Sequence, residues 1–243
     1  MAPASEFTAV FTVVLFFQMW EKLFHYLMFR MHFRRHGQLH GFTYLGSLTL
    51  IHISGSSEPE IKRRINLVRE AMSTLDQNIW RSSITLETKL RLYNTCILPI
   101  FLYGAETWSV TETLSKKIDA LDSWCLRRIL NVHWSEFVTN VEIRSRTGQP
   151  FLSDTVRRRR LSYFGHLHRT DSSQDHFRAL QACIMGPPAD WRRRIGRPRQ
   201  SWLRTVEADL RPMNLGLATL KRRAQNRSKW RKLIATATST TSS

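Results

Sequence analysis

The sequence is short of acidic residues, of paired cysteines and of long apolar runs. The first shortage makes the chain strongly basic, and the other two argue against a disulfide-stabilised or zinc-ribbon protein and against a membrane-spanning helix. Only 19 Asp and Glu stand against 37 Lys and Arg, which gives a net charge of +18. Cys96, Cys125 and Cys183 form no Cys-x-x-Cys pair, so neither a disulfide framework nor a zinc ribbon is indicated. A reducing location, nuclear or cytoplasmic, is therefore expected.

The longest apolar run covers residues 9–20 and ends at Glu21 and Lys22. It is shorter than the roughly 20 residues that span a bilayer, and no positive charge precedes it as in a signal peptide. Extending it over residues 8–33 would bury Glu21, Lys22 and His25, which is costly. Membrane association through residues 8–33 is kept as an alternative to a hydrophobic segment of unclear origin over residues 1–41.

His32, His36 and His40 recur at steps of four, and on a helix three imidazoles on one face could hold zinc. Gly37 and Gly41 weaken such a helix, and no supporting carboxylate lies nearby. We prefer a solvated basic segment, and no metal or cofactor is expected.

Most of the remaining chain has helical periodicity. Ser57 and Glu60 have capping-box spacing before an apolar stripe with helical steps, at Ile61, Ile65, Val68, Met72, Leu75 and Ile79. Lys62, Arg63, Arg64 and Arg69 lie off the stripe and indicate a solvated face, with nucleic-acid contact as the alternative. Further helices are predicted after Thr85, with a kink at Pro99, and from Thr111 to about Leu130, with Leu114, Ile118, Leu121, Cys125 and Ile129 facing inward. Others are predicted from Thr139 to Gly148, after the caps Ser153 and Asp154, and after the cap Ser201. Residues 42–54, rich in β-branched and aromatic side chains, predict two short strands.

The positive charge is concentrated in the second part of the chain. Residues 144–232 carry 22 basic and 6 acidic residues, which favours a polyanion as partner. Four successive arginines spanning more than one helical turn would be relieved of their repulsion by external phosphate. A solvated run or a nuclear-localisation signal is the alternative for these arginines. The expected contacts are Arg157, Arg158, Arg159, Arg160, Arg169, Arg192, Arg193, Arg194, Arg197, Arg199, Lys221, Arg222 and Arg223.

Three details qualify this basic region. His166 and His168 are expected to be structural or to contact phosphate. The loop 186–200 contains Gly196-Arg197-Pro198, which looks like the centre of an AT-hook with Ile195 in place of an arginine. One basic helix is predicted over residues 217–234, with a basic face that includes Arg227, Lys229, Arg231 and Lys232, and the low-complexity end 235–243 is expected to be disordered.

Several short motifs occur in one order: Phe42-Thr43-Tyr44-Leu45-Gly46, Leu102-Tyr103-Gly104-Ala105-Glu106-Thr107-Trp108, Cys125-Leu126-Arg127-Arg128-Ile129-Leu130, Gly165-His166, and Gly196-Arg197-Pro198 before Trp202. This order resembles the C-terminal part of the reverse transcriptase of non-LTR (LINE-type) retrotransposons, over about residues 42–232. The resemblance implies that the Phe-x-Tyr-Leu-Gly segment is a last palm strand and that the helices after it form a thumb.

The same resemblance predicts that the chain is not an enzyme. Polymerases of that family use palm aspartates to hold two Mg²⁺ ions, whereas the first aspartate here is Asp76 and no Asp-Asp pair exists. A C-terminal nuclease would need clustered acidic residues or a Cys/His knuckle, and none is evident.

The sequence thus predicts a mainly α protein with a thumb-like helical bundle, a short β-hairpin remnant and a basic helical C-terminal region. The predicted segments are 1–41, 42–148, 149–234 and a tail 235–243. The expected function is that of a truncated, catalytically incomplete reverse transcriptase fragment that binds RNA or DNA. A degraded transposon remnant without selected activity is the alternative, and the sequence leaves the oligomeric state open.

Overall fold

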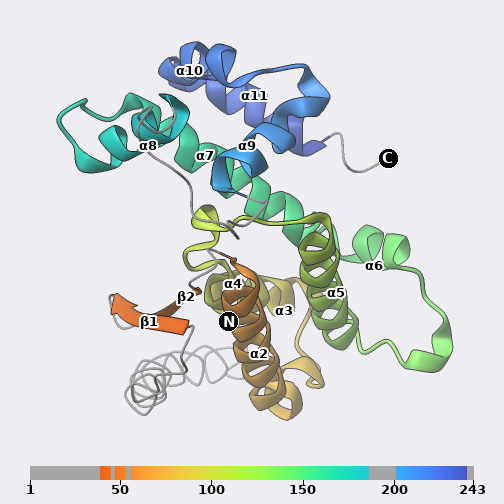
Figure 1. Ribbon diagram of the computed structural model, residues 1–243. Coiled ribbons are helices and arrows are strands. Elements are labelled where there is room, and N and C mark those ends of the chain that lie inside the picture. Colours follow the sequence, from red (N-terminus) through yellow and green to blue (C-terminus); the bar gives the residue numbers. More distant parts are fainter. Residues whose placement is uncertain (1–38, 45–46, 53–55, 186–200, 240–243) are drawn as a thin grey trace, which may run out of the picture. The chain divides into compact units, whose positions relative to one another are not determined.

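The computed structural model describes residues 39–44, 47–52, 56–185 and 201–239. The chain forms two compact units, residues 1–53 and 54–243, and its described part is mainly helical (Figure 1). The mainly α class is therefore confirmed. Across these described ranges no helix combines the length and the hydropathy of a membrane span. The segment 8–33 and the arginine-rich loop 186–200 lie outside the described residues.

The described part of the first unit is an antiparallel pair of strands. β1 (Leu39–Tyr44) pairs with β2 (Ser47–His52), with Leu39 opposite His52 and Tyr44 opposite Ser47. The pair begins three residues before the predicted start at Phe42 and ends at His52. His40 lies in β1, so it is not part of the helix that the three-histidine hypothesis required, and His32 and His36 lie outside the described residues.

The second unit begins with α2 (Glu58–Thr74) and a π-helical turn, η1 (Asp76–Trp80). The apolar stripe predicted on α2 faces the core, since Ile61, Val68, Met72 and Leu75 are buried. The predicted capping box is wrong. The Ser57 hydroxyl instead accepts a hydrogen bond from the Ser109 amide at 2.9 Å, which ties the start of α2 to a distant loop.

The prediction of a solvated basic face on α2 fails at Arg64. This side chain is buried and donates from Nε to Glu60 Oε1 at 2.7 Å and from Nη1 to the carbonyl of Ile100 at 3.0 Å. Arg63 also binds Glu60. Because Glu60 is itself buried, both arginines neutralise it in place, and they are structural residues.

The segment that begins at Thr85 forms one interrupted helix: α3 (Leu86–Leu92), the π-helical η2 (Tyr93–Ile97) and α4 (Leu98–Leu102). Thr85 caps it as predicted, with its hydroxyl accepting from the Thr88 amide. The wider turn stands directly before Pro99, whose ring cannot fit a regular α-helical interior. Phe101 is fully buried against Trp108, with ring centroids 5.3 Å apart.

Two further helices follow their predicted caps. The short 3₁₀ turn η3 (Ala105–Thr107) leads to α5 (Glu112–Ile129), which Thr111 caps, and α6 (Asn140–Thr147) is capped by Thr139 and ends at Gly148 with φ +62°. Between α5 and α6 lies a second 3₁₀ turn, η4 (Trp134–Glu136). The predicted inward face of α5 is confirmed, because Leu114, Ile118, Leu121, Cys125 and Ile129 are all buried.

A buried ion pair beside this core gives a pH-dependent prediction. Asp76, only 6% exposed, accepts from Arg128 Nε at 2.5 Å and pairs with Arg81 at 2.9 Å. The hydrogen bond from Arg128 lowers the pKa of the Asp76 carboxyl, and burial opposes it only in part. The folded pKa therefore lies below the unfolded value of about 3.9, so the stabilisation is present above that value and is lost as pH falls through the folded pKa.

Accordingly, Asp76→Asn is expected to flatten the acid limb of the stability curve below about pH 5. Denaturant titrations at several pH values between 7 and 3 measure this directly. Asp175→Asn, at an exposed ion pair with Arg178, is the matched control and should keep the parent slope. An Asp76→Asn variant with the parent's acid dependence would contradict the assignment.

The C-terminal half is built around α7 (Leu152–Arg169), which contacts α5, η3 and every helix after it. Those helices are α8 (Asp175–Met185), α9 (Trp202–Leu210), α10 (Leu217–Gln225) and α11 (Arg227–Ser239), and the 3₁₀ turn η5 (Arg211–Met213) follows α9. Their apolar side chains form one hydrophobic cluster with α7, which includes Leu161, Phe164, Val206, Leu220 and Trp230.

Several predictions at these helix ends are corrected. α7 begins at Leu152, and the backbone amide and hydroxyl of Ser153 donate to Asp119 of α5 at 2.9 and 2.7 Å. The single basic helix predicted over 217–234 is two helices, because the backbone turns at Asn226, whose side chain accepts from the Lys229 amide. The predicted disordered tail is helical through Ser239, with Ala237 and Thr238 buried.

The domain boundary predicted at residues 148–150 falls inside the second compact unit, at the turn between α6 and α7. Side chains from before and after this turn bind one another. Arg144 of α6 contacts Asp122 of α5 and donates to the Pro150 carbonyl at 2.8 Å. Asp122 also accepts from the buried Tyr93 hydroxyl, so the turn is joined to α5 and η2.

Candidate nucleic-acid interface

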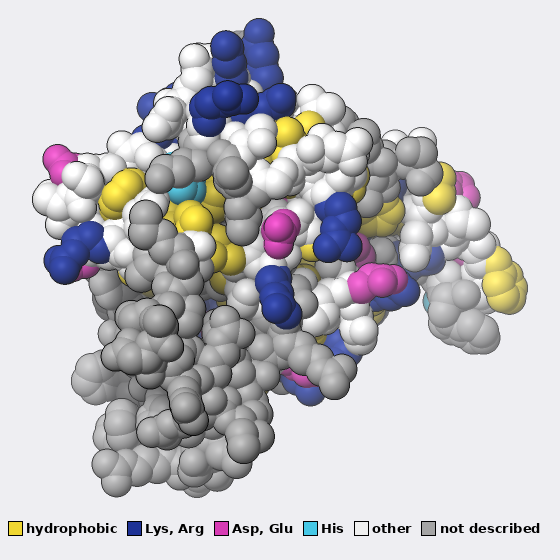
Figure 2. All heavy atoms as spheres, turned by 45° about the horizontal axis from the view of Figure 1, so that its top comes forward, with side chains coloured by type: hydrophobic (Ala, Val, Ile, Leu, Met, Phe, Trp, Pro, Cys, Tyr) yellow, Lys and Arg dark blue, Asp and Glu magenta, His cyan; other side chains and the backbone are white. Residues whose placement is uncertain are grey.

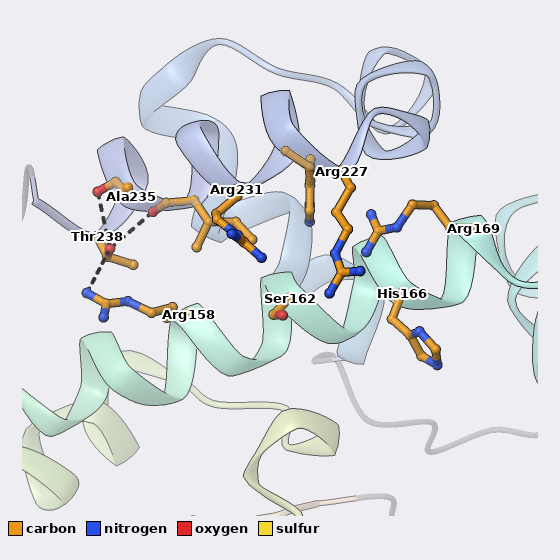
Figure 3. Close-up of a pocket in the computed structure, with 10 residues that line it drawn as sticks. Arg158, Ser162, His166, Arg169, Arg227, Arg231, Ala235 and Thr238 are labelled. Carbon is orange, nitrogen blue, oxygen red and sulfur yellow. Dashed lines mark hydrogen bonds between the residues drawn. The ribbon is translucent and has the colours of Figure 1, made fainter.

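A basic groove of about 880 Å³ runs between α7 and α11 (Figure 3). α7 contributes Arg158, Ser162, His166 and Arg169, and α11 contributes Arg227, Trp230, Arg231, Ile234, Ala235 and Thr238. The helical spacing explains this set, because residues three or four apart share one helix face. The two walls come from segments about sixty residues apart in the sequence.

The described lining of the groove carries positive charge and no negative charge. Four arginines line it, two from each helix, and no Asp or Glu is among the lining residues. α10 and α11 contain no acidic residue along their whole length. Figure 3 shows Arg227 reaching from α11 toward α7 beside Arg169. Cations held together in this way repel one another, and a phosphate group is an anion that a guanidinium binds well, through two parallel hydrogen bonds.

The groove exists because α11 approaches α7 very closely at Gly165. A Cβ atom on Gly165 would lie 2.1 Å from Nε1 and 2.4 Å from Cδ1 of Trp230. The Trp230 indole, 2% exposed, uses that space and donates to the Leu161 carbonyl at 2.9 Å. Glycine is needed here for the absence of a side chain, and the contact fixes the spacing of the two walls.

Arginines at both ends of the groove are anchored by neutral partners. Arg158 donates from Nη2 to the Thr238 hydroxyl at 3.5 Å, and Arg169 donates from Nη1 to the Ala224 carbonyl at 2.7 Å. Burial, followed by the nearby charge of Arg227, lowers the pKa of Arg169. Neutral partners position these guanidinium groups and leave their charge in place.

The four successive arginines of α7 do not share one role, so the prediction of a common phosphate site is wrong in part. Arg160 is 3% exposed and pairs with Asp209 of α9 through two hydrogen bonds of 2.8 and 3.1 Å. Arg157 is 3.4 Å from the same carboxylate. Arg159 donates to the Leu102 carbonyl at 3.1 Å. Only Arg158 of this run lines the groove.

The remaining predicted contacts are distributed over other surfaces. Arg222 and Arg223 are exposed on α10, and Lys221 belongs to the same helix. Arg192, Arg193, Arg194, Arg197 and Arg199 lie outside the described residues. Figure 2 shows Lys and Arg side chains gathered at the top edge of the visible face with no acidic side chain among them.

Sequence reasoning placed Arg227 and Arg231 on the basic face of the last predicted helix but did not name them among the individual contacts, although they line one wall of the groove. When residues 217–234 are treated as a single helix, the side chains after Asn226 are assigned directions that do not match those of the separate helix α11. The available signal was Asn226, a good N-cap residue directly before them. Of the two histidines, His166 is exposed and lines the groove, whereas His168 is buried against Phe164, with ring centroids 4.5 Å apart.

Other chemistry receives little support from the described ranges. No three His, Cys, Asp or Glu side chains within them are grouped so that they could hold a metal ion. His166 and His176 stack with ring centroids 6.4 Å apart, but they are only a pair. Burial raises the pKa of the Cys125 thiol well above its ordinary value, so this cysteine is a core residue rather than a nucleophile.

Comparison with known proteins identifies a distant relative. The chain matches no known protein-family model and no solved structure. It is 22% identical over 175 residues to an uncharacterised transposon-derived protein of Caenorhabditis elegans, across 70% of this chain and 60% of the relative. The chain thus spans somewhat less than two thirds of the length of the protein that it matches. It is similar to a transposon-derived protein, which is consistent with a transposon remnant.

Proposed function

We propose that this protein is a catalytically incomplete fragment of a non-LTR retrotransposon reverse transcriptase that binds nucleic acid through the groove between α7 and α11. The observation that carries the proposal is the convergence of Arg158, Arg169, Arg227 and Arg231 without an acidic residue among the groove lining. Each guanidinium that meets a phosphate releases condensed counterions, which supplies most of the affinity of such contacts.

Two further observations support the proposal. The relative is transposon-derived, and the order of short motifs resembles the end of a LINE-type reverse transcriptase. The absence of an Asp-Asp pair, with Asp76 as the first aspartate of the chain, argues against a two-metal polymerase site. What remains of such an enzyme is a helical scaffold with a cationic surface, for which RNA or DNA is the natural ligand.

The first test is the salt dependence of binding. Full-length protein titrated against a labelled oligonucleotide should lose affinity linearly on a log–log plot of binding constant against salt. Removing two groove cations with Arg227→Gln/Arg231→Gln should weaken binding about tenfold or more and reduce the salt slope by about one to two. Anisotropy titrations at four or more salt concentrations give both quantities.

The matched control is Lys229→Gln/Lys232→Gln. These lysines are exposed on the same helix but do not line the groove, so the net charge changes equally. Their replacement should weaken binding by less than about threefold, as loss of long-range attraction alone would. Affinity that does not fall with salt would contradict the proposed function, and equal losses in the two variants would contradict its assignment to the groove.

A further inference from the structure

We infer that the ligand of this groove is a single strand, held along one row of phosphates without reading its bases. The inference rests on the proposed function and narrows it from nucleic acid in general. It depends on the width of the groove, on the direction of its cations and on the burial of its aromatic residue.

The groove is the valley between two helices in direct contact. The Trp230 indole lies where a Cβ atom on Gly165 would be, with Nε1 2.1 Å from that position, so the two helices pack directly on each other, as helices with axes about 8–10 Å apart do. The major groove of a duplex is about 12 Å wide and accepts the convex face of one helix. A concave valley between two helices cannot enter it, so a duplex could place only one backbone against these cations.

The cations converge on one line. Arg158 and Arg169 come from α7, and Arg227 and Arg231 come from α11, on opposite walls of the same valley (Figure 3). A flexible strand can lay its phosphates between the two walls and receive hydrogen bonds from both sides. The two phosphate rows of a duplex are held apart, so the second row would find no counterpart in the groove.

The groove has a defined length. Arg158 and Arg169 are anchored on Thr238 and on the Ala224 carbonyl, and eleven residues of α7 separate them, or about 16 Å. At the spacing of one phosphate per 3.4 Å along a strand, this length holds about five phosphates, and fewer if the strand is extended. Because the end arginines are already positioned, binding orders few side chains and costs little entropy.

The groove offers bases no exposed Trp, Tyr or Phe ring among its described lining, and its one exposed ring, His166, already stacks with His176. Trp230 is 2% exposed, and its indole N–H donates to the Leu161 carbonyl. Its ring is therefore buried and not accessible to a base. The remaining lining, Ser162, Ile234 and Ala235, is small or apolar and suits sugar contacts. Affinity should therefore be nearly independent of base sequence, unlike that of proteins that splay bases onto aromatic platforms.

The test compares a 20-nucleotide strand with its own duplex, in DNA and in RNA, using full-length protein at one salt concentration. Charge density alone favours the duplex, so a strand that binds about tenfold more tightly would require the geometry described here. The salt slope for the strand should be near −3, because the four arginines of the groove neutralise about four phosphates at about 0.7 each. Affinity should increase steeply with strand length up to about five nucleotides and then level off.

The Arg227→Gln/Arg231→Gln variant should lose the preference for the single strand, and Lys229→Gln/Lys232→Gln should retain it. If duplex binds as tightly as the strand and is equally sensitive to the groove variant, this inference is overturned while the proposed function stands. If neither form binds, both fail. A strong preference among homopolymers of different bases would also overturn the inference, because it would require base contacts that the groove does not offer.

Discussion

Replacing Gly165 with alanine is expected to displace α11 from α7 and to destabilise the C-terminal half by about 1–3 kcal/mol. The new Cβ would overlap the Trp230 ring at 2.1 Å, and Arg169 Nη1 would lie 2.9 Å away. A ring that is buried and hydrogen-bonded cannot move aside by rotating. Helix propensity predicts the opposite sign, since alanine favours a helix over glycine by about 1 kcal/mol, so the measured sign decides between the two effects.

Denaturant titration followed by circular dichroism measures this change. Ser162→Ala, at an exposed position of the same helix, is the matched control and should leave stability unchanged within about 0.5 kcal/mol. In a double-mutant cycle, the cost of Gly165→Ala should be smaller when Trp230 is already leucine, because the two residues are in direct contact. A stabilising or neutral Gly165→Ala would show that the two helices do not approach as described.

Removing the carboxylate of Asp209 is expected to cost about 3–5 kcal/mol, because it leaves a buried arginine without its counter-charge. Arg160 is 3% exposed and donates two of its hydrogen bonds to this carboxylate, and Arg157 is also close to it. Among the described residues, the Arg160 guanidinium also donates to the carbonyl of Trp108 at 3.2 Å, and this partner is neutral. Asp209→Ala therefore leaves the buried charge of Arg160 without a counter-charge between α7 and α9.

The control for Asp209→Ala is Asp175→Ala, which breaks an ion pair whose two side chains are 98% and 71% exposed and should cost less than about 1 kcal/mol. Replacing both buried partners, as in Arg160→Met/Asp209→Leu, should restore much of the stability, since well-packed apolar residues often substitute for a buried pair. Nucleic-acid affinity of this double variant should remain near that of the parent. A large loss of affinity would instead indicate that Arg160 contacts phosphate.

The helices were largely predictable from the sequence because their signals are local. Thr85, Thr111, Thr139 and Ser201 each cap the helix that the pattern predicts, and the inward face of α5 follows from spacing alone. The errors occur where a distant partner intervenes. The Ser57 hydroxyl accepts a hydrogen bond from the Ser109 amide, 52 residues away, and nothing near Ser57 in the sequence indicates this partner.

The basic groove was predictable only in part, for a similar reason. Composition located the charge in residues 144–232 but could not separate arginines that find a carboxylate from those that do not. Arg158 and Arg160 are two residues apart, yet one lines the groove and the other is buried on Asp209. That difference depends on how α9 and α11 pack on α7, which is tertiary information.

The position of α11 also has a genetic consequence. This last helix supplies one wall of the groove and several members of the hydrophobic cluster, among them Trp230, Leu233, Ile234 and Ala237. A premature stop codon anywhere before residue 238 would therefore damage stability and the groove together. In a copy that is decaying without selection, stop codons should be as frequent over this final stretch as elsewhere. An open reading frame kept intact to residue 238 in many diverged copies would instead indicate that the folded protein is maintained.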